Sequence, residues 1–279
     1  MPSLSLQLRK TTMIRVKGLP LGIRADMPGL PPLLLLHGLL SSRNGWLPNL
    51  AALRSRYRLI LAELPGHGDA PPCTDPAQLH PDALVAALEE ARQRLQIPRW
   101  HLCGLSFGAG ITLRYALCHP HSVMAQVWTN GNRVLAPPPD AALLAQDEAR
   151  CVRLAAEGVA ALRAEGFHPR HGRRFPPALR DRLSAEADGC DIPTVIGLIR
   201  HCLPYLSLLD RFARTQVPVL LVNGRMEGRF QPVRNLAAGL LPAIAVTDLP
   251  GGHAINIEQP EAFDAAVLEF LARHDNSLG

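Results

Sequence analysis

Short apolar runs alternate along most of this chain with longer segments that carry apolar residues at helical spacing. An apolar run of four to eight residues is typical of a buried strand, whereas apolar residues three and four positions apart indicate one face of a helix. The alternation predicts a parallel sheet covered by helices. We expect strands at residues 33–36, 59–61, 100–105, 123–128, 217–222 and 244–249, edge strands at 5–8 and 21–25, and helices at 76–96, 108–118 and 260–273.

The alternation is interrupted once, between about residues 134 and 214, where a run of three prolines opens a segment with helical periodicity. Its helical stretches are residues 140–165, 177–187 and 192–212, and no convincing strand lies among them. A chain of 279 residues with 47% hydrophobic content can bury one large core and still carry such an insertion. We therefore predict a core made of residues 1–133 and 215–279, with residues 134–214 as a helical cap.

The most informative local motif is Gly104-Leu105-Ser106-Phe107-Gly108, which lies directly between a predicted strand and a predicted helix. A GxSxG pattern arises by chance in roughly one chain in ten of this length, and its strand-to-helix position makes chance less likely as an explanation. In such a turn the serine backbone is strained, and side chains at the flanking glycines would collide with the neighbouring strand and helix. Ser106 is therefore the candidate nucleophile.

A serine hydroxyl needs an adjacent base, and the base needs an orienting acid. After a serine on this kind of turn, the acid follows a later strand and the histidine follows the last one. His253 follows the last predicted strand behind two glycines, and it is the candidate base. Glu227 follows the strand at 217–222, three residues beyond Gly224, and is the candidate acid.

Other positions for the acid are less suitable. The segment after strand 123–128 offers Asn130 and Asn132, which cannot carry the charge that stabilises an imidazolium. Asp248 lies within the last strand, close to His253 along the chain. Glu227 is one methylene longer than the commoner aspartate and must reach the imidazole from farther back.

Hydrolysis through a tetrahedral intermediate also requires two backbone N–H groups aimed at the oxyanion. We expect one from Phe107, which follows the nucleophile, and the other from Leu39 in the loop after strand 33–36. His37 in the same loop could be mistaken for the base, but we expect it to brace the loop by hydrogen bonding.

The chain resembles the α/β-hydrolase superfamily, in the lidded branch that holds esterases, thioesterases and C–C bond hydrolases. The stretches that carry the resemblance are LLLLHGLLSSRNGW, ELPGHGDA, GLSFGAG, LLVNGRMEG and GGHAINIEQPEAF. The resemblance implies an α/β-hydrolase fold with an eight-stranded, mostly parallel sheet flanked by helices, and a helical cap over a site at the carboxyl ends of the strands. Glu227 departs from the usual aspartate, and the HGLL loop lacks the extra glycines of several lipase groups.

The serine favours cleavage of a carboxylic ester or thioester through an acyl-enzyme. Epoxide-opening and dehalogenating members of the superfamily use an aspartate nucleophile instead. An acyltransferase and a C–C bond (diketone) hydrolase remain open alternatives with the same three residues, and a non-catalytic ligand-binding protein is a third. No metal or organic cofactor is implied.

The cap is expected to determine the substrate. The crowded basic residues between 168 and 174 could bind a carboxylate or the phosphates of a coenzyme A thioester. A solvated basic loop is the simpler explanation, because all but two of the chain's 29 basic residues are arginine. The candidate substrate-binding residues are His37, Leu40, Arg170, Arg174 and Tyr205.

Composition limits the other functions. Six cysteines without CxxC spacing favour reduced thiols over zinc ligands or disulfides. The 5% aromatic content and the lack of a basic stripe argue against nucleic-acid binding. The longest apolar run near the N-terminus, residues 30–36, is far shorter than the roughly 20 residues of a membrane span, and the N-terminus lacks a signal pattern. We expect a cytoplasmic protein that binds a small acyl substrate, with its oligomeric state left open.

Overall fold

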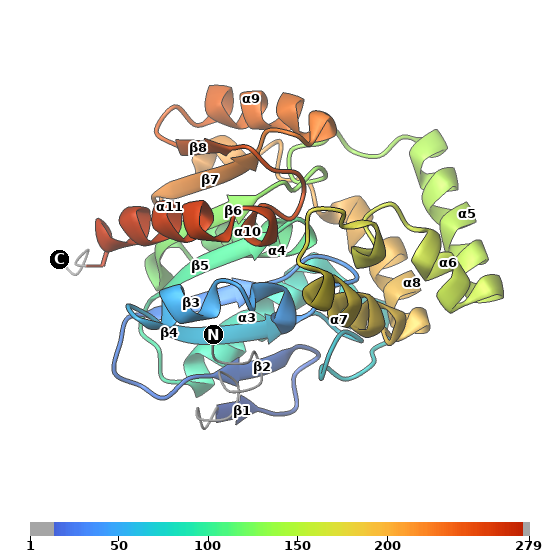
Figure 1. Cartoon of the computed structure of the whole chain (residues 1–279), viewed down its shortest axis with the longest axis horizontal. Coiled ribbons are helices and arrows are strands. Elements are labelled where there is room, and N and C mark those ends of the chain that lie inside the picture. The colour runs from blue at the N-terminus through green and yellow to red at the C-terminus, as the bar shows by residue number, and fades with distance from the viewer. Residues whose placement is uncertain (1–13, 276–279) are drawn as a thin grey trace.

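A computed structural model describes residues 14–275 and shows one eight-stranded sheet in the order β1-β2-β4-β3-β5-β6-β7-β8 (Figure 1). Strand β2 pairs antiparallel with both β1 and β4, and every other pair of neighbours is parallel. The predicted, mostly parallel sheet is confirmed. The strands are β1 (Ile14–Val16), β2 (Gly22–Ala25), β3 (Pro32–Leu36), β4 (Arg58–Glu63), β5 (Trp100–Leu105), β6 (Val123–Thr129), β7 (Val219–Gly224) and β8 (Ala245–Leu249).

Helices cover both faces of the sheet, and each face has its own apolar core. Alternate residues of β3 divide between the cores: Leu34 and Leu36 face one, and Leu33 and Leu35 face the other. Helices α3 (Pro81–Arg94), α4 (Phe107–Cys118) and α9 (Gln231–Leu240) cover the first face. The second face is covered by α1 (Leu50–Arg54), α10 (Ile255–Glu258) and α11 (Pro260–Ala272).

The segment between β6 and β7 forms helices α5 (Ala141–Glu157), α6 (Val159–Ala164), α7 (Pro177–Asp188) and α8 (Ile192–His201). These helices lie together at one end of the sheet (Figure 1). They share a small apolar cluster that includes Leu154, Leu162 and Val195, and Leu40 from the loop after β3 belongs to the same cluster. The insertion is thus packed against a loop of the site and is not an isolated appendage.

Three predicted helices are shorter than expected, each for a local reason. The stretch 76–96 divides into α2 (Pro76–Leu79) and α3, because His80 precedes a proline and adopts an extended backbone with ψ of 142°. The stretch 140–165 divides at Gly158, whose φ is 62°. Helix α8 ends at His201, and the remainder of 192–212 contains single 3₁₀ turns, the first with Pro204 in its opening positions.

The strand predictions that fall on described residues agree with the structure to within two residues at each end. The expected edge strand at 5–8 lies outside the described residues, and β1 was not predicted. Helices α1, α9 and α10 were not predicted either; two of them are short, at five and four residues.

Candidate active site

Ser106 lies on the sharp turn between β5 and α4. Its φ is 51°, in the left-handed region that costs a non-glycine residue on the order of 1–3 kcal/mol. Its backbone N–H donates to the carbonyl oxygen of Thr129 at 3.1 Å, which ties the turn to the end of β6. The side chain lines the large pocket described below.

The two glycines of the motif are required by close packing. A Cβ at Gly104 would lie 2.3 Å from Thr112 Oγ1 and 2.7 Å from Ala109 Cα. A Cβ at Gly108 would lie 2.5 Å from the carbonyl oxygens of Leu36 and His37. All of these distances are far below van der Waals contact, so the collisions expected from the sequence are present in the fold.

His253 and Glu227 are brought together from the loops after β8 and β7. The imidazole Nδ1 lies 2.9 Å from both Oε1 and Oε2 of Glu227. Burial raises the pKa of Glu227, but the hydrogen bond and charge of His253, together with two amide donors, outweigh burial and hold the pKa below its ordinary value. The carboxylate is therefore ionised and orients the ring, with Nε2 on the ring edge away from Glu227.

The two amide donors are Asn130 and Asn132, from the segment after β6. Asn130 Nδ2 donates to Glu227 Oε2 at 2.5 Å, and Asn132 Nδ2 donates to Oε1 at 2.7 Å. Asn130 also accepts from the N–H of Gly224 at 3.0 Å and donates to the carbonyl of Gly252 at 3.3 Å. This buried side chain thus links the ends of β6 and β7 to the loop that carries His253.

From the sequence we weighed these asparagines only as alternatives to the acid. Their role as hydrogen-bond donors to Glu227 was not predicted. Their role depends on the pairing of β6 with β7 in the fold, which brings the carboxyl ends of these two parallel strands together at one edge. Asp248 is engaged elsewhere, with Arg234 Nη2 at 2.7 Å and Asn223 Nδ2 at 2.7 Å.

The loop after β3 passes directly beside Ser106. A Cβ at Gly38 would lie 3.1 Å from Ser106 Cβ. The N–H of Leu40 donates to His67 Nε2 at 3.2 Å, so it is not available to an oxyanion. Leu39, whose N–H is the candidate donor in this loop, lines the same pocket as Ser106. Phe107 is the first residue of α4, where backbone N–H groups have no partner within the helix.

His37 is buried and lies outside the lining of the pocket. Its Nδ1–H donates to the carbonyl of Gly38 at 2.7 Å, and its Nε2 accepts from the N–H of Leu64 at 3.2 Å. The nearby His67 similarly donates from Nδ1 to Pro65 at 2.8 Å. Burial lowers the pKa of His37 to about 4 and that of His67 to about 3. Both rings are therefore neutral braces of the loops around the site.

These two histidines make stability depend on pH. Below pH of about 6.5 the unfolded chain binds protons on both rings, whereas the folded chain does not until the pH approaches 4. The free energy of unfolding should therefore fall as the pH is lowered from about 6.5 to about 4, by up to about 1.4 kcal/mol per histidine per pH unit. Urea titrations at several pH values measure the free energy of unfolding and hence its slope against pH. His67→Gln should make it shallower, with the exposed His121→Gln as the matched control; equal slopes in both variants would contradict the assignment.

The chain is similar to known proteins in both sequence and structure. Residues 31–150 match a family model described as the alpha/beta hydrolase fold. A hydrolase from Pseudomonas aeruginosa PA01 superimposes with a TM-score of 0.79 at 24% identity, over 95% of this chain and 99% of that one. The chain is an α/β-hydrolase-fold protein. The expected fold class is thereby confirmed.

Other similar proteins have the same fold. The carboxylesterase YbfK of Bacillus subtilis (strain 168) is 28% identical over 249 residues, which cover 86% of this chain and 80% of YbfK. The enol-lactonase from Burkholderia xenovorans LB400 superimposes with a TM-score of 0.79 at 22% identity, over 90% of this chain and 96% of that one. The resemblance of this α/β-hydrolase-fold protein to esterases, stated from its motifs, is confirmed.

The candidate catalytic residues of this α/β-hydrolase-fold protein line one pocket of about 750 Å³, a size typical of small-molecule sites. Ser106, His253, Glu227, Leu39 and Phe107 all contribute to its wall. Its apolar lining comes from the core and from the segment between β6 and β7, and includes Leu40, Leu105, Phe167, Phe175, Leu183, Leu203, Leu206 and Ile257.

Four of the five sequence candidates for substrate binding lie outside this lining: His37, described above, and Tyr205, Arg174 and Arg170. Tyr205 is exposed and packs against the ring of His80, with centroids 5.1 Å apart. Arg174 Nη1 lies 3.3 Å from Glu258 Oε2. Arg170 lies on the exposed turn η3 (Pro169–His171), although its neighbour Pro169 does line the pocket. Of the five candidates, the structure places Leu40 on the wall.

Helix α7 is joined to the loop that carries Leu39. Glu186 Oε2 accepts from Ser42 Oγ at 2.5 Å, and its Oε1 accepts from Asn44 Nδ2 at 2.7 Å. Ser42 Oγ in turn accepts from the backbone N–H of Asn44 at 3.0 Å. The position of the candidate oxyanion loop is therefore coupled to the helical insertion.

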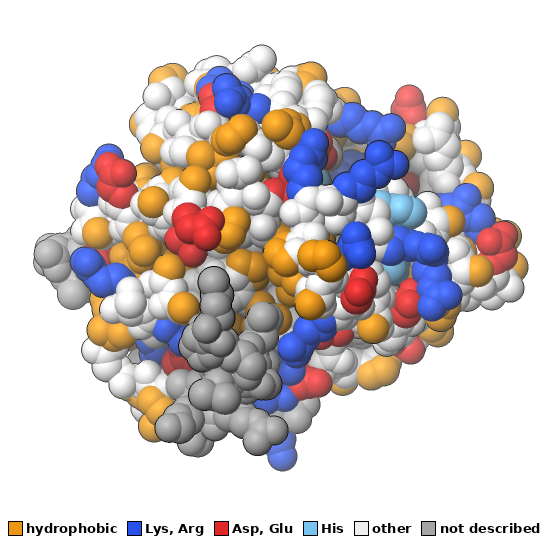
Figure 2. Space-filling model, in the orientation of Figure 1, with side chains coloured by type: hydrophobic (Ala, Val, Ile, Leu, Met, Phe, Trp, Pro, Cys, Tyr) orange, Lys and Arg blue, Asp and Glu red, His pale blue; other side chains and the backbone are white. Residues whose placement is uncertain are grey.

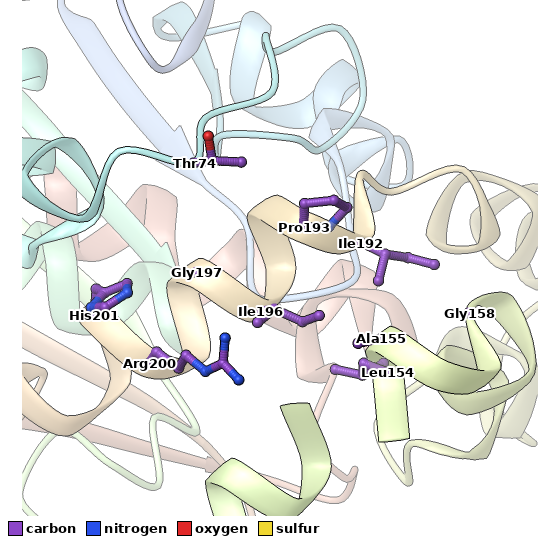
Figure 3. Close-up of a pocket in the computed structure, with 10 residues that line it drawn as sticks. All are labelled: Thr74, Leu154, Ala155, Gly158, Ile192, Pro193, Ile196, Gly197, Arg200 and His201. Atoms are coloured by element: carbon purple, nitrogen blue, oxygen red, sulfur yellow. The ribbon is translucent and has the colours of Figure 1, made fainter. Parts of the chain in front are cut away.

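A second cavity of about 570 Å³ lies between α5, α8 and the loop at Thr74 (Figure 3). Its wall is mostly apolar, and its arginine, Arg200, is paired with Glu148 at 2.5 Å. None of the candidate catalytic residues lines it. The chemistry-bearing side chains thus converge on the other pocket.

Two further features bear on function. Among residues 14–275, no group of three or more His, Cys, Asp or Glu side chains is placed to hold a metal ion. In the same part of the chain, no helix is both long enough and apolar enough to cross a bilayer.

Proposed function

We propose that this protein is a serine hydrolase that cleaves a carboxylic ester or thioester through an acyl-enzyme. The observation that carries the proposal is the bond of 2.9 Å between His253 Nδ1 and Glu227, formed on the wall of the pocket that Ser106 also lines. A carboxylate, an imidazole and a strained serine on one pocket are the parts that nucleophilic acyl transfer requires.

The mechanism assigns one role to each residue. Ser106 Oγ attacks the substrate carbonyl while His253 Nε2 takes its proton, and Glu227 stabilises the imidazolium that forms. The N–H groups of Leu39 and Phe107 stabilise the oxyanion. The imidazolium then protonates the leaving alcohol or thiol. A water activated by His253 releases the acyl group and restores Ser106.

Residues 134–214 form the proposed cap over this site. Leu183 of α7, Phe167 and Leu203 come from this segment and line the pocket with Ser106. The acyl portion of a small substrate would pack against these apolar side chains, which exclude water from the reacting carbonyl. We further propose a cytoplasmic enzyme that needs no metal or organic cofactor.

A panel of para-nitrophenyl esters, thioesters and amides of varied acyl length tests the proposal, with products analysed in the presence and absence of an alcohol acceptor. Hydrolysis to the free acid, with a burst of the first product, is expected. Activity should fall on acidification, because a protonated imidazole cannot accept the proton of Ser106. Exclusive formation of the transfer product would show an acyltransferase instead. No turnover of any ester or thioester would contradict the proposal.

Asn132 is a proposed positioning residue for the acid. Asn132→Ala removes the donor 2.7 Å from Glu227 Oε1; because a hydrogen bond to a charged group contributes about 1.5–3 kcal/mol, we expect kcat to fall about tenfold. KM and the melting temperature should change little, since Asn132 is only half-buried. Asn235→Ala is the control, because this exposed amide contacts Arg234 and lies outside the pocket lining. An equal loss of kcat in both variants would mean a general structural effect.

A further inference from the structure

Arginines are prominent on the wall of the candidate active site, and two of them are neutralised. Arg133 lines the pocket and pairs with Asp147 at 3.0 Å. Arg150 also lines it, pairs with Glu165 at 2.9 Å, and lies over the ring of Phe167 at 5.1 Å. These two arginines are committed to structural ion pairs.

Arg229 differs from the other two arginines of the pocket wall. It lines the pocket and is exposed, and no acidic side chain within residues 14–275 lies within ion-pair distance of it. The acid closest along the chain, Glu227, is already engaged by His253 and two asparagines. A positive charge without a partner is therefore presented to any molecule that enters the pocket.

The backbone that carries Arg229 is held firmly. It belongs to the turn η6 (Gly228–Phe230), where the N–H of Phe230 donates to the carbonyl of Glu227 at 3.0 Å. The ring of Phe230 is fully buried and packs edge-on against Trp128, with centroids 5.7 Å apart. Gln231 Nε2 donates to the same carbonyl of Glu227 at 3.0 Å. The backbone of Arg229 is thus held in place relative to the candidate acid, two residues away.

The cap adds positive charge near the opening. The loop between Pro169 and Phe175 has both of these ends on the pocket wall, and it carries Arg170 and Arg173 as exposed side chains. Figure 2 shows basic side chains, with a histidine among them, gathered on the part of this face where the helices of the insertion lie. Arg174 of this loop is paired with Glu258, whose Oε2 also accepts from the N–H of Gly252 at 2.8 Å.

We propose that the substrate is an anionic ester, and that Arg229 binds its carboxylate or other oxyacid group while Ser106 attacks the ester carbonyl. This inference rests on the proposed hydrolase function and adds the substrate class to it. A guanidinium presents a planar set of donors that matches an oxyacid group. Arg170 and Arg173 raise the local concentration of such a substrate at low ionic strength. The apolar wall receives the uncharged portion.

Two ester pairs that differ in charge test the inference. The first pair places the charge on the acyl half: the para-nitrophenyl monoester of glutaric acid against para-nitrophenyl pentanoate. The second pair places it on the alcohol half: the butyrate ester of para-hydroxybenzoate against that of para-hydroxybenzamide. The measured quantity is the ratio of kcat/KM for the anionic ester to that for its neutral partner, in wild type, Arg229→Gln and Arg225→Gln. Arg225 is the matched control, since it is an exposed arginine of the same connection after β7 that lies outside the pocket lining.

The wild-type ratio is expected to exceed one in at least one pair, and that pair shows which half of the substrate carries the charge. Arg229→Gln should lower the ratio about tenfold, as loss of one charge-assisted contact predicts. Arg225→Gln should lower the ratio by less than about twofold, because Arg225 lies outside the pocket lining and would act on the substrate only through a screened field. A ratio at or below one in both pairs, or an equal fall in both variants, would overturn the inference and leave the hydrolase function standing. Failure to cleave any of the four esters, together with no labelling by a fluorophosphonate, would overturn both.

Discussion

Replacement of Ser106 by alanine is expected to lower kcat/KM for ester hydrolysis by at least about 10³-fold, because the acyl-enzyme can no longer form. The fold should be preserved, since the left-handed turn at this position is held by the hydrogen bond to Thr129 and by the packing of Gly104 and Gly108. Steady-state kinetics with a para-nitrophenyl ester measure the loss. The residual rate reports what the backbone donors and the pocket contribute without a nucleophile.

Ser41 is the matched variant, because it is another hydroxyl on the wall of the same pocket. Ser41→Ala should retain activity to within about tenfold, a loss typical of a substrate contact and far smaller than the loss of a nucleophile. If Ser41→Ala were the inactive variant and Ser106→Ala retained turnover, the assignment of the nucleophile would be wrong.

Glu227→Gln is expected to lower kcat by roughly 10³-fold or more, as loss of a triad carboxylate does elsewhere. All three partners of Glu227 donate to it: His253 Nδ1–H, Asn130 Nδ2 and Asn132 Nδ2. A carboxamide has one acceptor oxygen and one NH₂ group, so at least one of these donors would face another donor. The variant therefore loses the charge and also disturbs the orientation of the imidazole.

Glu227→Asp separates these two effects. It keeps the charge but shortens the side chain by one methylene, so an intermediate loss of kcat is expected. Thermal unfolding should show only a modest decrease for Glu227→Gln, because one unsatisfied donor costs on the order of 1–3 kcal/mol. A loss of kcat below about tenfold in Glu227→Gln would mean that another group orients His253.

Much of the fold could be predicted from local patterns. The runs at β3, β5, β6 and β7 are apolar because these strands are buried on both faces, and such runs are recognisable without knowing the partners. The divisions of the helical stretches at Pro81 and Gly158 also had local causes that the apolar spacing concealed. Strand β1 is three residues long and carries too little pattern to be recognised.

In the candidate site, too, the residues with local signals were predictable and those that depend on tertiary contacts were not. Ser106, His253 and Glu227 were identifiable because their glycine context and their order along the chain are local or topological signals. Asn130 and Asn132, the donors to Glu227, could not be identified from the sequence, and neither could Arg229 as a pocket arginine without an ion-pair partner. Hydrogen bonding and charge neutralisation depend on which side chains the fold brings together. Arg174 is a residue that the sequence suggested and the fold does not support. The crowded basic residues around it could have formed an anion site, but the fold pairs Arg174 with Glu258.

The most direct test of the account is covalent labelling of the folded protein with a fluorophosphonate, followed by mass spectrometry of the modified peptide. The account predicts rapid, stoichiometric modification of Ser106 in wild type, with slow modification in Glu227→Gln, because only an oxygen activated by an oriented imidazole attacks such a probe quickly. Modification at another serine, or labelling of Ser106 at the same rate in Glu227→Gln, would contradict it.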